Sequence, residues 1–513
     1  MFVKAYTSTL SGIDALTVTV EVDISTGIGM FLVGLPDNAV KESQERIRTA
    51  FLNSGFRMTG KKVVVNLAPA DLRKEGSAYD LPMAIAILAA SGQADDKLLG
   101  DYVIAGELSL DGSLAHVKGV LPMAVRARNE GFKGIVIPRV NAREAAVVAG
   151  LDVIAVDNLK QAAGFLSGDI AIEPYVLEEA QEVALSNNPY EEDFSDVKGQ
   201  AHVKRALEIA AAGGHNIIMI GPPGSGKTML ARRLPTIMPP LSHEEALETT
   251  KIHSVAGKTG AEGGLLVRRP FRAPHHLTSQ VALVGGGVSP QPGEISLAHN
   301  GILFLDELPE FGRALLEVLR QPLEDKTITV SRAKYTVEYP ANFMLAASMN
   351  PCPCGYFNHP AKECVCSRGA VMKYMNRISG PLFDRIDLHI EVTPVEIGQM
   401  GSSAVPESSE RVRRRVVEAR EIQRRRFAEC PGIHVNAMMN SKMLRSYAPL
   451  SAECASLLER AMERLNLSAR AYDRVIKVAR TIADLEAAAD VQPNHIAEAI
   501  TYRDLDRGQW GIK

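Results

Sequence analysis

Cysteine, tryptophan and long apolar runs are scarce in this chain. Among its 513 residues are six cysteines, one tryptophan and 5% aromatic residues. No apolar stretch is long enough to cross a bilayer, and the charged, alternating first residues lack the pattern of a signal peptide. We therefore expect a cytoplasmic protein with no membrane partner and no disulfides, in which clustered cysteines bind metal.

Net charge is also nearly lacking. The chain has 57 Lys and Arg against 60 Asp and Glu, a formal net charge of −3. Whole-chain electrostatics therefore do not predict a polyanionic partner, and any contact with nucleic acid has to come from a local basic patch. The hydrophobic fraction of 46% is typical of a soluble globular protein. The length predicts about two to four domains.

Hydrophobic periodicity divides the chain into four segments. Residues 1–165 mix strands, such as 16–25 and 62–69, with helices, such as 38–56 and 80–92, and indicate an α+β domain. Residues 166–195 are acidic and polar, as in a linker. Residues 196–395 alternate as in an α/β domain, and residues 396–513 are nearly all helical. We expect a multidomain α/β protein.

The stretch IIMIGPPGSGKTML, residues 217–230, is the strongest motif in the chain. It has the spacing of a phosphate-binding loop, with a strand before it and a helix after it. The loop's backbone amides would bind phosphate at the helix N-terminus, Lys227 would reach the β- and γ-phosphates, and Thr228 would bind Mg²⁺. The predicted ATP-binding residues are Gly221, Pro222, Pro223, Gly224, Ser225, Gly226, Lys227, Thr228 and Met229.

Two later strands end in polar residues that suit ATP hydrolysis. Asp306 and Glu307 follow the apolar run 302–305, where Asp306 would hold Mg²⁺ and Glu307 would polarise the attacking water. Asn350 ends the next apolar strand and could hydrogen-bond the γ-phosphate or that water. The alternative for the two carboxylates is an acidic helix N-terminus that merely follows a strand.

Arginines further along the chain could stabilise the negative charge of the transferred phosphoryl group. Arg385 lies between short apolar runs, and a planar, always charged guanidinium suits that role. The alternative is a structural ion pair of Arg385 with Asp384 or Asp387. Arg470, Arg474 and Lys477 lie on one face of a predicted helix, from which one of them could reach the nucleotide. The alternative is a solvated basic stripe.

Four of the six cysteines lie in one loop directly after Asn350. Cys352, Cys354, Cys364 and Cys366 form two C-x-C pairs that can supply four thiolates to a tetrahedral zinc ion. His359 is a substitute ligand. Because no ligand position is left for water, such a zinc ion would stiffen the loop and would not catalyse. Reduced, unliganded thiols are the alternative.

The central segment resembles the AAA+ ATPases of the magnesium-chelatase type. Three stretches carry the resemblance: RRPFRAPHHLTS, PQPGEISLAHNGILFLDELPEF and SGPLFDRIDLHIEV. With the first domain and the cysteine loop, nearly the whole chain resembles the ComM/YifB group, which is associated with natural transformation. The resemblance implies a P-loop α/β core, a C-terminal helical lid and a homohexameric ring formed on ATP or DNA. It makes Lys227, Asp306 and Glu307 the ATPase core, Asn350 a sensor, Arg385 a trans-acting arginine finger and Arg470 a second sensor.

The resemblance also implies a motor that acts on single-stranded or branched DNA, as a helicase or in branch migration. Residues 324–340 read as a hairpin with Arg332 and Lys334 at its tip, where they would meet backbone phosphates. The stretch 253–276 offers Arg268, Arg269 and Arg272, interleaved with Phe271 and His275, which could track or stack on a strand. Fold-stabilising ion pairs are the alternative for both.

Two other functions remain open. One is a chelatase-type or protein-remodelling ATPase that acts on a protein partner. The other is a nucleotide-binding module without activity, against which the presence of both Asp306 and Glu307 argues.

Residues 1–165 resemble the Lon-protease-like domain, a ribosomal S5 domain 2-type fold. The resemblance places Ala78 where the nucleophilic serine belongs and Leu121 at the position of the activating lysine, so the dyad is missing. The alternative is Ser77 as a nucleophile in a shifted register. We expect a binding or assembly domain and no peptidase activity.

Overall fold

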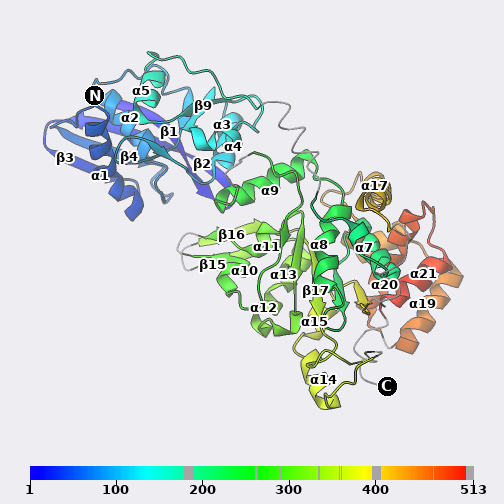
Figure 1. Ribbon diagram of the computed structural model, residues 1–513. Helices are drawn as coiled ribbons and strands as arrows, with labels where there is room; N and C mark the ends of the chain where they lie inside the picture. The colour runs from blue at the N-terminus through cyan, green and yellow to red at the C-terminus, as the bar shows by residue number, and fades with distance from the viewer. Residues whose placement is uncertain are drawn as a thin grey trace.

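The computed structural model describes residues 1–177, 190–259, 264–287, 290–332, 335–357, 359, 361–394, 406–465 and 467–503. An N-terminal domain, a central α/β core and a group of C-terminal helices follow one another across the molecule (Figure 1). In these ranges no helix combines the length and the apolar character that crossing a bilayer would require.

The N-terminal domain is built on a seven-stranded sheet whose strand order is β3-β4-β2-β1-β5-β8-β9. Fully buried residues alternate with more accessible ones along β2 and β4, and α1 and α2 contribute with these strands to one apolar cluster. The strands are β1 (Phe2–Ser11), β2 (Asp14–Ser25), β3 (Gly29–Val33), β4 (Lys62–Ala68), β5 (Tyr102–Ile104), β8 (Gly134–Pro138) and β9 (Asp152–Val156), with a separate ribbon of β6 (Glu107–Leu108) and β7 (Leu114–Ala115). The helices are α1 (Asn38–Asn53), α2 (Asp80–Ala90), α3 (Val120–Asn129), α4 (Ala142–Ala145) and α5 (Leu159–Leu166), and η1 (Arg139–Asn141) is a 3₁₀ turn.

The strands predicted at 16–25 and 62–69 and the helices predicted at 38–56 and 80–92 are all present. The sequence YVIAGELSLDGSL, residues 102–114, predicts a hairpin with Asp111-Gly112 at its turn, but the hairpin in the structure is shorter. Residues 102–104 instead join the large sheet as β5, and only β6 and β7 pair around the Asp111-Gly112 turn.

The two positions that the resemblance to the Lon-protease-like domain assigns to a serine and a lysine hold side chains that pack in the core. Leu121 is buried, and Ala78 packs against the same apolar cluster. Ser77 donates a hydrogen bond to the Glu107 carboxylate. The Lys74 ammonium donates to the backbone carbonyls of Pro69 and Leu72. The serine and the lysine of this region are therefore each bound to other partners.

The central core is a parallel sheet of five strands in the order β11-β14-β17-β10-β18. The three inner strands are buried along their whole length, which explains why the sequence shows them as continuous apolar runs. The strands are β11 (Phe271–Arg272), β14 (Ile302–Leu305), β17 (Met344–Met349), β10 (Ile217–Ile220) and β18 (Leu388–Glu391).

Helices and two small ribbons surround this sheet. The larger helices are α7 (Ala201–Gly213), α8 (Lys227–Ile237), α9 (His243–Val255), α12 (Arg313–Val318), α13 (Arg320–Asp325) and α14 (Arg368–Met375), and the shorter ones are α10 (Gln280–Val284), α11 (Glu294–Leu297) and α15 (Gly380–Phe383). The 3₁₀ turns are η2 (Phe194–Asp196) and η3 (Leu308–Glu310). The ribbons pair β12 (Gly285–Gly286) with β13 (Gln291–Pro292) and β15 (Thr327–Arg332) with β16 (Tyr335–Pro340).

The C-terminal helices pack directly on this core. One apolar cluster joins these helices to one face of the core sheet. It includes Val412 and Val416 from α17 and Val475 and Ala479 from α20. The helices are α17 (Ser409–Arg426), α18 (Ser441–Tyr447), α19 (Ala452–Leu465), α20 (Ala469–Leu485) and α21 (Pro493–Thr501), with η4 (Asn436–Met438) as a 3₁₀ turn. Phe194, inside the predicted linker, belongs to the same cluster, so the chain joins the core before residue 196.

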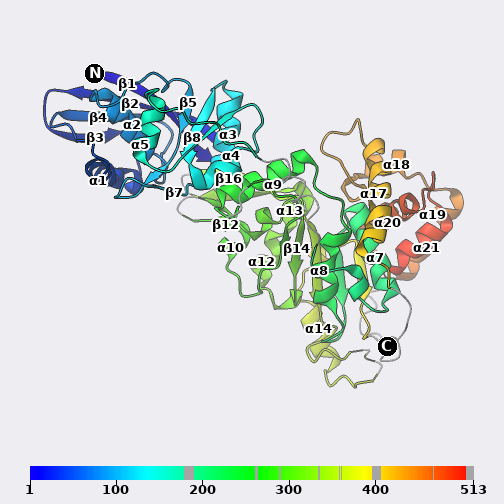
Figure 2. The same cartoon turned by 45° about the horizontal axis from the view of Figure 1, so that its top comes forward.

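Helix α9 of the core lies against the N-terminal domain, as both views show (Figure 1, Figure 2). The Ser254 hydroxyl donates to the buried Glu144 carboxylate, and the Gly119 N–H donates to the Ser254 carbonyl at 3.2 Å. Lys251 of α9 pairs with Asp14 at 3.0 Å. At the adjacent β1–β2 turn, a Cβ added to Gly12 would lie 3.3 Å from Val337 of β16. The N-terminal domain thus contacts both α9 and the β15–β16 ribbon.

Candidate nucleotide-binding site

The predicted phosphate loop runs from β10 to the first turn of α8. Gly224 and Gly226 adopt φ angles of +78° and +89°, a backbone conformation that side chains disfavour. A Cβ on Gly221 would lie 2.2 Å from the Val392 carbonyl oxygen, so this position has room only for glycine. The Ser225 hydroxyl is buried without a hydrogen-bond partner in the part of the chain that the structure describes. The loop therefore has the shape and the spare polar group of an anion cradle.

Lys227 lies inside this loop. Its ammonium group donates to the carbonyls of Gly221 and Pro222 at 2.7 and 2.9 Å and approaches the Asn350 side-chain oxygen at 3.4 Å. Burial lowers the pKa of Lys227, and the charges of Asp306 and Glu307 act in the opposite direction. A buried cation beside two carboxylates is suited to receiving an anion in place of the carbonyls that it now contacts.

Thr228 and Asp306 bring two oxygen ligands together. The Thr228 hydroxyl donates to Asp306 at 2.7 Å, and the Ser348 hydroxyl donates to the other oxygen of the same carboxylate. Hydroxyl and carboxylate oxygens are the ligands that Mg²⁺ prefers. Because parallel strands end at the same edge of the sheet, β10, β14 and β17 place Lys227, Asp306 and Asn350 side by side.

Glu307 follows Asp306 in the left-handed conformation, with φ of 54°. Its N–H donates to the Asp306 carboxylate at 3.0 Å, and its own carboxylate lies 3.6 Å from Nδ1 of His276. Glu307 is thus exposed at the rim of the loop, where a water molecule has access to it.

Arg385 does not fit the role of a trans-acting finger in this conformation. Its side chain is 6% exposed, pairs with Glu324 and donates to the Pro381 carbonyl at 2.6 Å. A finger has to reach the nucleotide of a neighbouring subunit, whereas this guanidinium is used within its own subunit. The sequence anticipated a structural ion pair as the alternative but proposed the wrong partner, since spacing alone favoured Asp384 or Asp387.

The three basic residues that the sequence places on one face of α20 have different environments. Arg470 is exposed at the first turn, and no hydrogen bond or ion pair joins it to another described residue. Arg474 pairs with Asp387 and donates to the Arg385 carbonyl at 3.1 Å. Lys477 donates to the Ala437 carbonyl at 2.9 Å. Only Arg470 is therefore free to reach a ligand.

Asp387 is the centre of a buried network between the core and α20. It accepts from the Asn216 N–H at 3.0 Å and lies 3.6 Å from His215. Burial alone would raise the pKa of Asp387, but the charges of Arg474 and His215 hold that pKa well below its usual range. The Arg474–Asp387 pair thus holds α20 against the strand that follows Arg385.

The predicted DNA-contacting residues of the insert are engaged within the fold. Arg269 is 9% exposed, pairs with Glu245 and donates to the carbonyls of Pro239 and Asn300, both at 2.7 Å. Arg272 binds Glu294 through two hydrogen bonds of 2.6 and 2.7 Å, and Arg268 stacks on Tyr190. The prediction of a DNA contact does not match the environment of Arg269, whose N–H donors all have protein partners.

The predicted hairpin between Asp306 and Asn350 is confirmed. Strands β15 and β16 pair antiparallel up to Arg332 and Tyr335. The sequence pattern indicates a first strand to about Val330 and a turn near residues 331–334, whereas β15 continues to Arg332. Arg332 thus ends β15 next to the tip, and Lys334 lies outside the described residues.

The cysteine loop forms a compact cluster of thiols. Ligand atoms of Cys352, Cys354, Cys364 and Cys366 all lie within 4.8 Å of one another, and the closest sulfur pairs are 3.3 to 3.7 Å apart. Four sulfurs bound to one zinc ion at about 2.3 Å would be about 3.8 Å apart. The cluster fits that geometry. His359 instead accepts hydrogen bonds from the N–H groups of Ala361 and Lys362, and the four cysteines form a group that could hold a metal ion.

The thiols differ in acidity. Burial opposes ionisation of Cys354, but hydrogen bonds from the Tyr356 backbone and the other thiols lower its pKa to about 6. Burial and the neighbouring thiols raise the pKa of Cys364 to about 12. Ionisation of one thiol therefore makes ionisation of the next less favourable, because the negative charges repel each other. A bound cation would offset that repulsion.

This loop touches the phosphate loop. Gly355, with φ of +85°, packs so closely that a Cβ there would lie 2.6 Å from Pro223. The sequence predicted a cysteine loop near the sensor residue Asn350 but gave no sign of this contact with the phosphate loop.

Three further side chains of the site went unrecognised in the sequence. Gln200 donates to the Ser225 carbonyl at 2.9 Å, Ser348 binds Asp306, and His276 approaches Glu307. Single polar residues of this kind carry no spacing signal. The paired histidines His275 and His276, which follow β11 after two intervening residues, were the one available indication.

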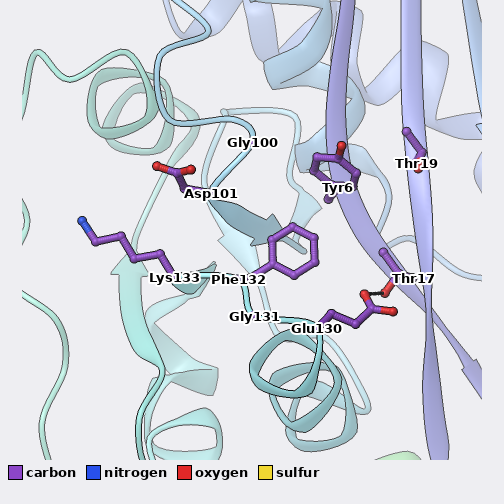
Figure 3. Close-up of a pocket in the computed structure, with 9 residues that line it drawn as sticks. All are labelled: Tyr6, Thr17, Thr19, Gly100, Asp101, Glu130, Gly131, Phe132 and Lys133. Carbon is purple, nitrogen blue, oxygen red and sulfur yellow. Dashed lines mark hydrogen bonds between the residues drawn. The ribbon is translucent and has the colours of Figure 1, made fainter.

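A separate hollow of about 870 Å³ lies on the N-terminal domain. It is lined by Tyr6, Thr17 and Thr19 from β1 and β2, by Gly100 and Asp101 before β5, and by residues 130–133 after α3 (Figure 3). Among these side chains the one hydrogen bond drawn joins Thr17 to Glu130 (Figure 3). It is not part of the phosphate-loop site.

The parallel sheet, the phosphate loop after its β10 strand and the carboxylates after β14 define the class of AAA+ ATPases. Three family models match the chain: "Magnesium chelatase, subunit ChlI" over residues 193–400, "Subunit ChlI of Mg-chelatase" over 20–141 and "Magnesium chelatase, subunit ChlI C-terminal" over 406–503.

Relatives extend this match to the full length. The chain is 44% identical to YifB of Escherichia coli and 44% identical to competence protein ComM of Haemophilus influenzae, in each case over 98% of this chain and 97% of the relative. A shorter match, 27% identity over 30% of this chain, relates it to 29% of Lon protease 2 of Bacillus subtilis. The protein belongs to the ComM/YifB family of magnesium-chelatase-like AAA+ ATPases.

The buried network predicts that replacing Arg474 and replacing Arg470, both on α20, will lower the free energy of unfolding by different amounts. Arg474→Met should destabilise the core by about 3 kcal/mol, because Asp387 would stay buried without its guanidinium partner. Arg470→Met should leave stability unchanged, since Arg470 is exposed. Thermal unfolding of both variants beside the wild type is the measurement. Equal midpoints for the wild type and Arg474→Met would contradict the assigned role of the pair.

Proposed function

We propose that this protein is an ATP-driven DNA motor, a helicase that drives branch migration of recombination intermediates as a homohexameric ring. The observation that carries the proposal is the β15–β16 ribbon, which extends from the core between the strands that end in Asp306 and Asn350. The ribbon lies in the sequence between these two strands. A movement of Asp306 or Asn350 at the nucleotide would therefore have a short path to an element that can contact a substrate. The name of the Haemophilus relative, a competence protein, agrees with DNA as that substrate.

The chain's own residues suit ATP hydrolysis. The amides from Gly221 to Met229 would bind the phosphates, with Lys227 at the β- and γ-phosphates and Arg470 reaching the nucleotide from α20. Thr228 and Asp306 would hold Mg²⁺, which when bound neutralises phosphate charge. Glu307 would orient the attacking water and Asn350 would hydrogen-bond it or the γ-phosphate.

DNA would be contacted at the end of the β15–β16 ribbon. Arg332 and Lys334 are its basic residues, and cations there would bind backbone phosphates of any sequence. Such contacts suit a motor, because a motor has to bind each successive stretch of strand equally well. Arg269 and Arg272 are left out of this interface, since their carboxylate partners already hold them.

A zinc ion bound by Cys352, Cys354, Cys364 and Cys366 would be structural. All four coordination positions would be taken by sulfur, so none is left for water. The cation would fix Gly355 against Pro223 and thereby support the phosphate loop. In the reducing cytoplasm, where we place the protein, these thiols would remain available to a metal.

The second candidate function is a chelatase-type or protein-remodelling ATPase. The N-terminal domain, which contacts both α9 and the β15–β16 ribbon, is the observation in its favour. It would bind or assemble partners without cleaving them, because Leu121 and Ala78 leave no serine–lysine dyad.

Glu307→Gln should lower ATP hydrolysis by about 100-fold or more while leaving nucleotide binding intact, because the amide cannot polarise water. Lys227→Ala should instead abolish nucleotide binding. Hydrolysis and unwinding of forked and four-way-junction DNA are measured together. Unwinding by Glu307→Gln at the wild-type rate would refute an ATP-driven motor.

Reversing the charge at the end of the ribbon should remove the effect of DNA and leave basal ATP hydrolysis in place. The double variant Arg332→Glu, Lys334→Glu should weaken DNA binding at least about tenfold and abolish DNA-stimulated hydrolysis, while basal hydrolysis is retained. The matched control is Arg411→Glu, Arg414→Glu, the same charge change on exposed positions of α17. If DNA stimulates ATP hydrolysis by the wild type and by the ribbon variant equally, the DNA contact lies elsewhere. If the ribbon variant instead loses stimulation of hydrolysis by a protein client, the second candidate function is favoured.

Metal analysis tests the thiol cluster. The purified protein should contain about one zinc ion per chain, and Cys352→Ser should lose it and raise the KM for ATP. Cys430→Ser changes a cysteine outside the cluster and should keep the zinc. Protein without zinc, whose assembly and hydrolysis are unaffected by Cys352→Ser, would rule out the structural metal.

A further inference from the structure

A cleft of about 930 Å³ lies between the core sheet and the C-terminal helices. Gly301 and Phe343, which directly precede β14 and β17, line it from the core, and Val417 and Arg420 line it from α17. The parallel strands begin at this edge of the sheet and end at the phosphate loop. The cleft is therefore across the sheet from the nucleotide site, and a ligand in it would not compete with ATP for space.

Apolar side chains form much of the wall of this cleft. Among them are Met238, Phe343, Phe427, Ile433 and Val435. A concave site of several hundred Å³ with apolar walls and a few charged groups is typical of sites that bind small organic molecules. The charged groups then decide which class of molecule fits.

Most carboxylates of the cleft already have basic partners. The pairs are Glu245 with Arg269, Glu248 with His299 and Glu421 with Arg424, at 2.7 to 2.9 Å. The remaining carboxylate, that of Glu244, belongs to an exposed residue, so water screens its charge. These acidic groups therefore leave the other cations of the cleft without a partner.

Lys326 is one of those cations. It follows α13 and precedes β15, and its half-buried side chain has no hydrogen bond or ion pair with any other described residue. Burial lowers the pKa of Lys326, the charge of Asp387 opposes this effect, and the charges of Lys477 and Arg474 add to it. Around the single carboxylate of Asp387 there are thus three cations, of which Lys326 is the one that lines the cleft.

Arg420 is the other cation without an acidic partner. Its Nε and Nη2 both donate to the Ala211 carbonyl, at 3.1 and 2.7 Å, and its Nη1 has no hydrogen-bond partner in the described part of the chain. Burial and the charge of Arg269 lower the pKa of Arg420, and the charge of Glu245 opposes them. Since cations removed from water are normally paired with anions, Lys326 and Arg420 together lack about two negative charges.

We propose that this cleft binds a small organic phosphate, a phosphomonoester with an aromatic body. A phosphomonoester carries close to two negative charges at neutral pH, which matches Lys326 and Arg420, whereas a carboxylate carries only one. The aromatic body would pack on the apolar wall that includes Phe343 and Phe427. The ligand would contact the core and α17 at the same time.

Binding of 1-naphthyl phosphate tests the proposal while a non-hydrolysable ATP analogue saturates the phosphate loop. One molecule should bind per chain, and inorganic phosphate and 1-naphthoate should each bind at least about tenfold more weakly, because one lacks the body and the other a charge. Lys326→Gln should weaken binding about tenfold, and Lys326→Arg should retain it. The matched control is Lys442→Gln, at an exposed position of α18, which should bind as the wild type does.

Thermal unfolding gives a second readout. 1-Naphthyl phosphate should raise the unfolding midpoint of the wild type and of Lys442→Gln, but not that of Lys326→Gln. Without the phosphate, Lys326→Gln should unfold at the wild-type temperature or above it, because it removes an unpaired, half-buried charge.

Three results would overturn the proposal. The first is no binding of 1-naphthyl phosphate to the wild type at millimolar concentration. The second is equal affinity for the wild type and Lys326→Gln. The third is complete displacement by the ATP analogue, which would place the probe at the phosphate loop.

Discussion

The parallel pairing of β14, β17 and β10 is the constraint on which the rest of the molecule depends. These strands are buried on both faces, so their side chains are apolar along their length, with the exception of Ser348 near the end of β17. Polar residues can enter only where the strands end, and parallel strands end at one edge. Lys227, Asp306 and Asn350 follow three different strands and still meet, because the sheet leaves them no other location.

This constraint also explains why so much of the site could be predicted from the sequence. A buried strand followed by a glycine-rich turn or by carboxylates is a local pattern, and the residues 217–230 and 302–307 display it without any tertiary information. The helices and strands of the N-terminal domain were equally accessible, since periodicity and turn residues are local too.

The arginines show where such reasoning ends. Arg269, Arg272 and Arg385 have the right chemistry for a phosphate, but each is held by a carboxylate distant in sequence: Glu245, Glu294 and Glu324. A charge becomes available for a ligand only if the fold leaves it unpaired, and spacing does not reveal that. The sequence likewise does not reveal that His276 approaches the Glu307 carboxylate, because the fold alone brings the two side chains together.

The contact between the β1–β2 turn and β16 has a mechanical consequence. Gly12 lies against Val337, and Asp14, two residues away, is tied to Lys251 of α9. The β1–β2 turn thereby contacts the ribbon and α9 at the same time. A displacement of the ribbon would therefore be transmitted to the N-terminal domain, and that domain would in turn limit how far the ribbon can move.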